Sequence, residues 1–141
     1  MESPYMKKLE NYKNSLEVLK SADFEKAYSD EIYRTGIIGQ FNLTFELAWK
    51  ATQAVMQEHG VEGSETGSPK ELLKLGYKCG FLDDGDVWLT MLKKRNQSTH
   101  IYDEDEIDEL ILLIRDTFIK RMETLVQVLE KKSEPEVGEG Q

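Results

Sequence analysis

The spacing of apolar residues predicts a helix at the start of the chain. Apolar residues recur there every three or four positions, as in an amphipathic helix with a narrow buried face: Tyr5, Leu9, Tyr12, Leu16 and Leu19. Ser3 and Pro4 suit its N-cap and first turn. Residues 21–23 are expected to end this helix, and residues 25–30 form a polar connection with room for a short helical turn.

Residues 31–59 predict a second, long helix whose centre is apolar nearly all round, so we expect it to be the most buried element. Gly36 and Gly39 lie three positions apart on one side of it, where glycine lowers helix stability. Either another backbone approaches closely there, or a long helix simply tolerates both glycines. Polar side chains also form a line along this helix: Asn42, Glu46, Lys50 and Gln53.

A loop and a short helix follow. Glycines among Glu, Ser and Thr predict a loop over residues 60–67, and no Gly-Lys-Ser or Gly-Lys-Thr follows to make it a phosphate-binding loop. Ser68, Pro69 and Glu71 then give a strong helix start, with a serine cap, a proline at the first position and a glutamate three residues after the cap. Gly80 is expected to end this helix.

The next helix is expected to begin at Asp83. Leu82 and Val87 bracket Asp83 at the spacing of a hydrophobic staple, and Asp86 stands where a capping box has its acid. Together with Asp84, these aspartates suggest a metal site, but their spacing is not that of a calcium loop. We interpret them as caps, because acidic side chains stabilise a helix N-terminus.

The last predicted helix opens at residues 103–106 and runs to about residue 132. Its apolar stripe is long: Ile107, Leu110, Ile111, Ile114, Phe118, Met122, Leu125 and Leu129. No segment alternates with period two. The predicted fold is therefore an all-α, up-and-down bundle of four main helices plus one short helix, with no sheet, over residues 1–132. Residues 133–141 lack a core-forming pattern and are expected to be a disordered acidic tail.

The net charge and the cysteine content limit the functions that this chain can have. The net charge is −9 and the sequence pI is about 4.8, so the chain lacks the broad basic face that coats nucleic acid, and any RNA contact must be local. The single cysteine, Cys79, allows no disulfide within the chain and no Cys/His metal cluster. We expect a cytoplasmic protein with no metal, no cofactor, no membrane span and no signal peptide.

The residues that could form a functional site lie where the fourth predicted helix ends. Arg95 continues the buried stripe of Trp88, Met91 and Leu92, so its guanidinium should point inward or toward a partner chain, where it needs a carboxylate or a phosphate. Glu46 is a candidate partner. His100 is five residues on, about 140° around an unbroken helix. The polar run 96–99 predicts a turn that could bring His100 and Tyr102 beside Arg95. The structural alternative is an arginine near a helix C-terminus followed by a loop histidine.

The sequence Arg95-Asn96, three residues, His100, one residue, Tyr102 resembles the signature of HEPN domains, small helical modules of toxin–antitoxin pairs and RNA-cutting enzymes. Three further segments look like the HEPN branch called nucleotidyltransferase substrate-binding proteins: Gln40 to Lys50, Ser68 to Glu71, and Asp83 to Trp88. The resemblance spans roughly residues 5 to 130.

This resemblance implies a homodimer that works with a small nucleotidyltransferase as a toxin–antitoxin-like module. The toxin would be a metal-independent endoribonuclease in which Arg95 and His100 of two subunits face each other across the dimer cleft. Histidine can exchange a proton near neutral pH, and arginine can steady the phosphate as charge builds. Asn96 would bond the phosphate or hold His100. Tyr102 would accept AMP from the partner, which silences the toxin.

Two other functions stay open. The same pocket could hold a substrate or nucleotide for the transferase partner without catalysis, a function that the acidic balance favours slightly. The protein could also be a purely structural dimerisation bundle in which Arg95 pairs with an acid. The chain does not itself carry a transferase site, because Gly63-Ser64 lies in a predicted loop and Asp103-Glu104-Asp105 starts a helix.

Overall fold

The computed structural model describes residues 4–100 and 103–133, and every regular element in this part of the chain is helical. The helices are α1 (Pro4–Lys20), α2 (Glu31–Glu58), α3 (Pro69–Lys78), α4 (Gly85–Gln97), α5 (Glu104–Leu113) and α6 (Ile119–Ser133), with the short turns η1 (Lys26–Tyr28), η2 (Ser98–His100) and η3 (Ile114–Phe118). The predicted all-α fold class is confirmed. None of the described helices is long and apolar enough to cross a membrane.

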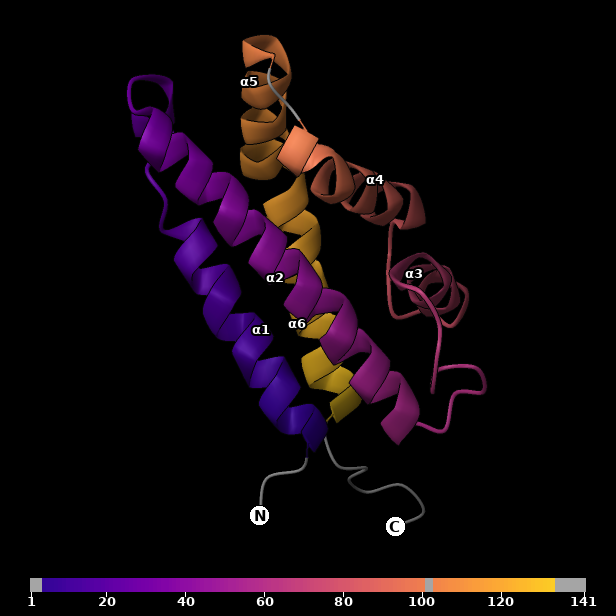
Figure 1. The fold of residues 1–141 in the computed structure, drawn as a ribbon. Helices are drawn as coiled ribbons and strands as arrows, with labels where there is room; N and C mark the ends of the chain where they lie inside the picture. Colours follow the sequence, from indigo (N-terminus) through magenta and orange to yellow (C-terminus); the bar gives the residue numbers. More distant parts are fainter. Residues whose placement is uncertain (1–3, 101–102, 134–141) are drawn as a thin grey trace.

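Three long elements lie lengthwise: α1, α2 and the run of α5, η3 and α6 (Figure 1). Helices α1 and α2 pack side by side in opposite directions, and the predicted apolar face of α1 is the buried one. Tyr12 on that face is fully buried, and its hydroxyl donates a hydrogen bond to the backbone carbonyl of Met122 at 2.6 Å. This bond ties the first helix to the last.

Helix α2 supplies the centre of the core. Phe41 and Phe45 are fully buried, and the Phe41 ring stacks on Phe118 with ring centroids 5.3 Å apart. The close-approach explanation for Gly36 and Gly39 is wrong within the chain. Among the described residues, no atom beyond the helix itself and the glycines' own neighbours lies within 4 Å of where a side chain would begin at either position. Both glycines instead lie on the exposed side of α2.

The C-terminal helix predicted over residues 103–132 is one helical path with an irregularity at its middle. Helices α5 and α6 join through η3, a π-helical turn in which the Ile119 N–H donates to the Ile114 carbonyl. The sequence pattern predicted the path but not the wide turn. Ser133 ends α6, and the rest of the predicted tail, residues 134–141, lies outside the described residues.

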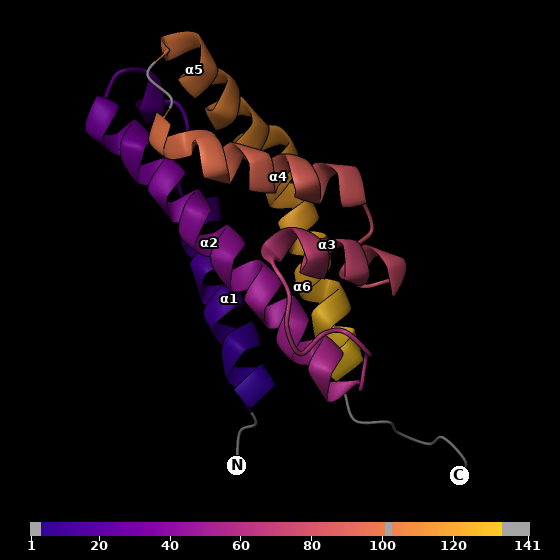
Figure 2. The ribbon, with the colours of Figure 1, turned by 45° about the vertical axis from the view of Figure 1, so that its right-hand side comes forward.

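Helices α3 and α4 cross the lengthwise helices at a steep angle on one side (Figure 2). The predicted capping box of α3 is present: the Ser68 hydroxyl accepts from the Glu71 N–H, and the Glu71 carboxylate accepts from the Ser68 N–H. The predicted start of α4 is wrong by one residue. The cap is Asp84, whose backbone is extended and whose carboxylate accepts from the Val87 N–H at 3.2 Å. Asp83 instead pairs with Arg121 of α6.

Candidate functional site

The last turn of α4 places Arg95 against the middle of α2. Trp88 and Met91 are fully buried, and the stripe that they begin brings Arg95 to the edge of the core with its side chain 35% exposed. Its guanidinium forms an ion pair with the Glu46 carboxylate, which is 24% exposed. The expected contact between Arg95 and Glu46 is therefore present. Lys50 lies 4.0 Å from the other Glu46 oxygen, on the solvent side.

A second contact from α2 holds the end of α4. The Asn42 side-chain amide donates to the Ser98 hydroxyl at 2.9 Å, and that hydroxyl donates to the Arg95 backbone carbonyl at 2.8 Å. Asn42 and Glu46 are four residues apart on one face of α2, so together they fix the position at which the chain leaves α4. Sequence reasoning placed Asn42 on this polar line but assigned no role to Ser98. The signal was available, because serine is frequent where a helix gives way to a turn.

His100 follows Arg95 closely in sequence but is not bonded to it in the described part of the chain. The predicted break after α4 is present as η2, and His100 ends that turn with an exposed ring. Within residues 4–100 and 103–133, no hydrogen bond or ion pair joins His100 to Arg95. Asn96 is exposed, and its side-chain oxygen accepts from the Arg95 guanidinium at 3.1 Å. Tyr102 lies outside the described residues.

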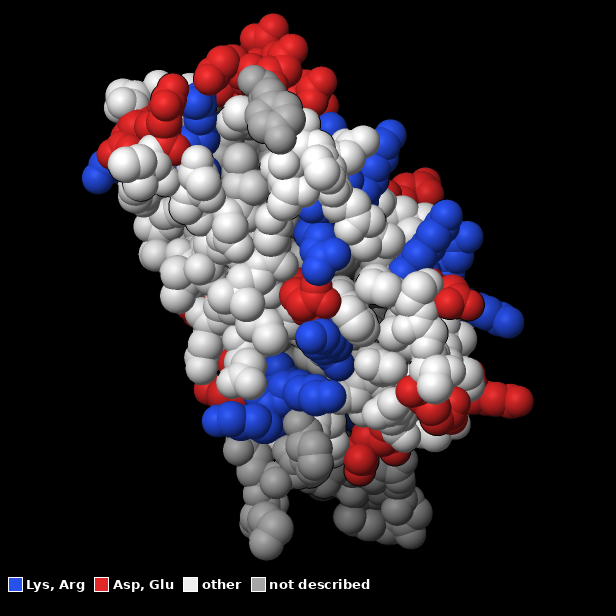
Figure 3. All heavy atoms as spheres, in the orientation of Figure 1, with Lys and Arg blue, Asp and Glu red and all other residues white. Residues whose placement is uncertain are grey.

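Acidic side chains gather at the end of the molecule where α5 begins, seen as the red cluster at the top of Figure 3. Glu104 and Asp108 from this end both pair with Arg34, at 2.9 and 3.5 Å. Lys94 reaches Glu109 at 3.5 Å. Arg34 and Lys94 are therefore both paired with acidic side chains of α5.

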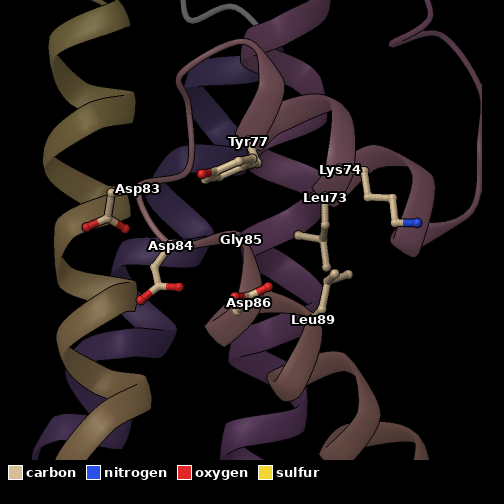
Figure 4. Close-up of a pocket in the computed structure, with 8 residues that line it drawn as sticks. All are labelled: Leu73, Lys74, Tyr77, Asp83, Asp84, Gly85, Asp86 and Leu89. Carbon is tan, nitrogen blue, oxygen red and sulfur yellow. The ribbon is translucent and has the colours of Figure 1, made fainter.

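A separate concavity between α3 and α4 has a volume of about 240 Å³ and is shown in Figure 4. Two of the aspartates that line it have structural roles, because Asp84 caps α4 and Asp83 forms an ion pair with Arg121. The Tyr77 ring covers Gly85, where an added Cβ would lie 3.0 Å from the ring. In the part of the chain that the structure describes, no group of three or more His, Cys, Asp or Glu residues is placed to hold a metal ion.

The fold and this site define a class: small helical bundle proteins with an arginine and a histidine at the junction between one helix and the next turn. The chain belongs to the family of nucleotidyltransferase substrate binding protein-like proteins, whose model matches residues 7–131. The predicted family is confirmed.

Individual relatives agree with this assignment. The chain is 22% identical over 111 residues to the Haemophilus influenzae protein named "Probable ribonuclease HepT", covering 77% of this chain and 76% of that protein. A crystal structure of a Thermus thermophilus protein is 29% identical with a TM-score of 0.71, covering 87% of this chain and 99% of that one. The structure of HI0074 from Haemophilus influenzae, described as the fold of a substrate binding domain of a nucleotidyltransferase, shares the fold with a TM-score of 0.73 at 19% identity, over 86% of this chain and 98% of that one.

Proposed function

We propose that this protein is the HEPN subunit of a two-component, toxin–antitoxin-like module and a metal-independent endoribonuclease that acts as a homodimer. The observation that carries the proposal is the geometry at the end of α4. Arg95 is oriented by Glu46 but remains 35% exposed, and His100 ends the next turn with its ring in solvent. Both side chains that the family signature contributes are therefore accessible on one edge of the molecule.

The chemistry requires only these groups. The 2′-hydroxyl of a ribose attacks the adjacent phosphorus, and the bond to the 5′-oxygen breaks to leave a 2′,3′-cyclic phosphate and a free 5′-hydroxyl. One proton leaves the 2′-oxygen and one reaches the 5′-oxygen. An imidazole in solvent can serve either transfer near neutral pH. The Arg95 guanidinium can bind the phosphate oxygens as their charge increases.

The dimer completes the site. Arg95 and His100 of one chain form no hydrogen bond or ion pair within the described residues. Two copies that face each other would supply two arginines and two histidines to one cleft. The acidic balance of the chain limits RNA contact to this cleft, since a net charge of −9 repels a polyanion elsewhere.

The test is an RNA cleavage assay with protein purified free of any partner, with a chelator present. His100→Ala should abolish cleavage, since acid–base help contributes about 10²–10⁴-fold. The chain has two histidines, and His59→Ala is the matched control, because His59 lies at the far end of α2 against the Lys132 carbonyl. Arg95→Ala should also abolish cleavage. Its control is Arg121→Ala, which breaks an ion pair of similar exposure on α6.

The transferase partner is the second component. The family to which the chain belongs supports a nucleotidyltransferase as the partner. We propose that this partner transfers AMP to Tyr102 and so silences the nuclease. Mass spectrometry should find one added AMP on the wild-type protein and none on Tyr102→Phe. Tyr28→Phe and Tyr77→Phe are controls, because both tyrosines are about half exposed, at 49% and 55%. Unchanged modification of Tyr102→Phe would show that the acceptor lies elsewhere.

The alternative is a non-catalytic subunit that binds a substrate or nucleotide for the transferase. The neutralisation of Arg95 by Glu46 favours it, because a carboxylate competes with any phosphate for the guanidinium. Calorimetry with nucleotides would test this function. Wild-type protein that cuts no RNA but binds a nucleotide, and loses that binding in Arg95→Ala, would support the alternative over the nuclease.

A further inference from the structure

Part of the surface over α1 and the first half of α2 carries no charge, although 32% of the residues in the chain are charged. Figure 3 shows this area as white surface on the left of the view, with charged side chains below it and to its right. Two grooves, of about 390 and 490 Å³, run between these helices and share Val18 and Gln40, and none of the residues that line either groove is charged. Val18, Ile32 and Leu43 project from this face with exposures of 56%, 86% and 51%.

Four of the exposed residues of α2 on this face, two large and two small, form a palindrome of spacing. Ile32, Gly36, Gly39 and Leu43 follow one another at spacings of four, three and four residues. Ile32 and Leu43 therefore have the same midpoint as Gly36 and Gly39, between residues 37 and 38. A helix that meets an antiparallel copy of itself about this midpoint places each large side chain against a large one and each glycine against a glycine. The glycines leave the backbone open at the centre, where two helices must approach most closely.

We propose that this face is the seam of the homodimer, with α2 packed antiparallel against α2 of a second copy about a two-fold axis between residues 37 and 38. Ile32 contacts the partner's Leu43, and Gly36 contacts the partner's Gly39. Closed two-fold interfaces need a surface that is complementary to itself, and the palindrome supplies it. Exposed apolar side chains that would otherwise stay in water are buried in the process.

Charge argues for a second copy and for the antiparallel direction. Two chains of net charge −9 repel each other, and this repulsion is weakest where the facing surfaces carry no charge. The acidic cluster at the start of α5 lies near the beginning of α2, since Arg34 of α2 pairs with Glu104 and Asp108. Parallel pairing would bring the two Arg34 positions and their acidic partners side by side, whereas antiparallel pairing about this axis sets the two Arg34 positions about 10 Å apart along the seam.

The seam also places the candidate site, and this step rests on the proposed function. Asn42, which bonds Ser98, is roughly 7 Å along α2 from the proposed axis at 1.5 Å per residue. Arg95 contacts Glu46 of α2, and Ser98, three residues later, contacts Asn42, which is closer to the proposed axis. The chain therefore runs toward the axis as it enters η2. A two-fold axis perpendicular to both helices keeps both η2 turns on the same side of the seam. Both copies of His100 then border one cleft.

Mixed-cysteine cross-linking tests the register. In a Cys79→Ser background, which removes the one natural cysteine, Ile32→Cys and Leu43→Cys chains carrying different tags are oxidised alone and mixed. Antiparallel pairing predicts a covalent heterodimer from the mixture and little product from either alone, because equivalent Ile32 positions lie about 16 Å apart along the helices, beyond disulfide reach. If Ile32→Cys alone cross-links as fast as the mixture of Ile32→Cys and Leu43→Cys, the pairing is parallel and the proposal is overturned.

Sedimentation of Leu43→Glu is the second measurement. It should convert the dimer to monomer at tens of micromolar, whereas Leu112→Glu, at a 38% exposed leucine of α5, should stay dimeric. Added salt should not dissociate the wild-type dimer, since the seam is uncharged. A Leu43→Glu protein that remains dimeric, or a mixture that forms no heterodimer, would refute this seam without bearing on RNA cleavage. Correct cross-linking in a protein that cuts no RNA would refute the nuclease proposal and leave the seam.

Discussion

Breaking the ion pair between Glu46 and Arg95 should cost more stability than breaking a comparable pair at the surface. Exposed ion pairs contribute about 0.2–1 kcal/mol, whereas hydrogen bonds to charged groups contribute about 1.5–3 kcal/mol when partly protected from water. The Glu46 side chain is 24% exposed and that of Arg95 is 35% exposed, so this pair falls between those limits. We expect a coupling free energy of about 1–2 kcal/mol.

The assay is a double-mutant cycle on the free energy of unfolding, with Glu46→Gln, Arg95→Gln and the double variant. Glu46→Gln alone should lower the Tm by about 3–8 °C for a domain of this size. The Asp83 and Arg121 pair is the reference, because its side chains are 36% and 31% exposed and both lie away from the candidate site. Its coupling should be at most about 1 kcal/mol.

The same substitution should change anion binding in the opposite sense. Removing the Glu46 charge takes away a carboxylate that is hydrogen-bonded to the guanidinium and competes with a phosphate for it, an effect worth about 1 kcal/mol in a water-like dielectric. RNA affinity at fixed salt should therefore rise about fivefold. A coupling no larger than that of Asp83 with Arg121, together with unchanged affinity, would show that Glu46 does not restrain Arg95 in solution.

Three further predictions follow from other contacts. Asn42→Ala should lower stability by about 1 kcal/mol and speed amide hydrogen exchange at Ser98; unchanged exchange would exclude the role of Asn42 in holding η2. Burial, and to a lesser extent Glu123, raises the pKa of Tyr12, so its stabilising effect is complete below about pH 10 and declines as pH rises beyond that value; alkaline unfolding of Tyr12→Phe should lack this decline. Ser68→Ala should lose about 0.5–2 kcal/mol in urea unfolding through the missing cap.

Local patterns predicted most of the helices because the physics behind them is local. The buried face of α1 follows from a three- and four-residue period, and the start of α3 follows from the capping box at Ser68. The start of α4 was missed by one residue because neighbouring aspartates cap equally well, and only the competing partner Arg121, 38 residues away, decides between them. The contact of Arg95 with Glu46 could be inferred because both residues interrupt apolar surfaces.

Other features depend on contacts that no local pattern encodes. Asn42 meets Ser98 across 56 residues of sequence, so the position of η2 follows from tertiary packing rather than from propensity. The turn predicted after α4 exists, but among the described residues no hydrogen bond or ion pair joins His100 to Arg95. The π-turn was also missed. Consecutive four-residue steps from Ile114 to Phe118 to Met122 suit a turn wider than 3.6 residues, yet the same residues also fit an ordinary amphipathic stripe.

We expect that wide turn to divide the run of α5, η3 and α6 into two units that unfold separately. At η3 the regular i to i−4 ladder is interrupted, and the Ile119 amide bonds five residues back to Ile114. An interruption of this kind is where a helix can open on one side without unravelling on the other. Helix α6 carries the bond from Tyr12, whereas α5 is held at its outer end by exposed acids around Arg34. We therefore expect opening free energies from native-state exchange to fall abruptly between α6 and α5, so that the half of the helix next to the candidate site exchanges while the other half stays closed.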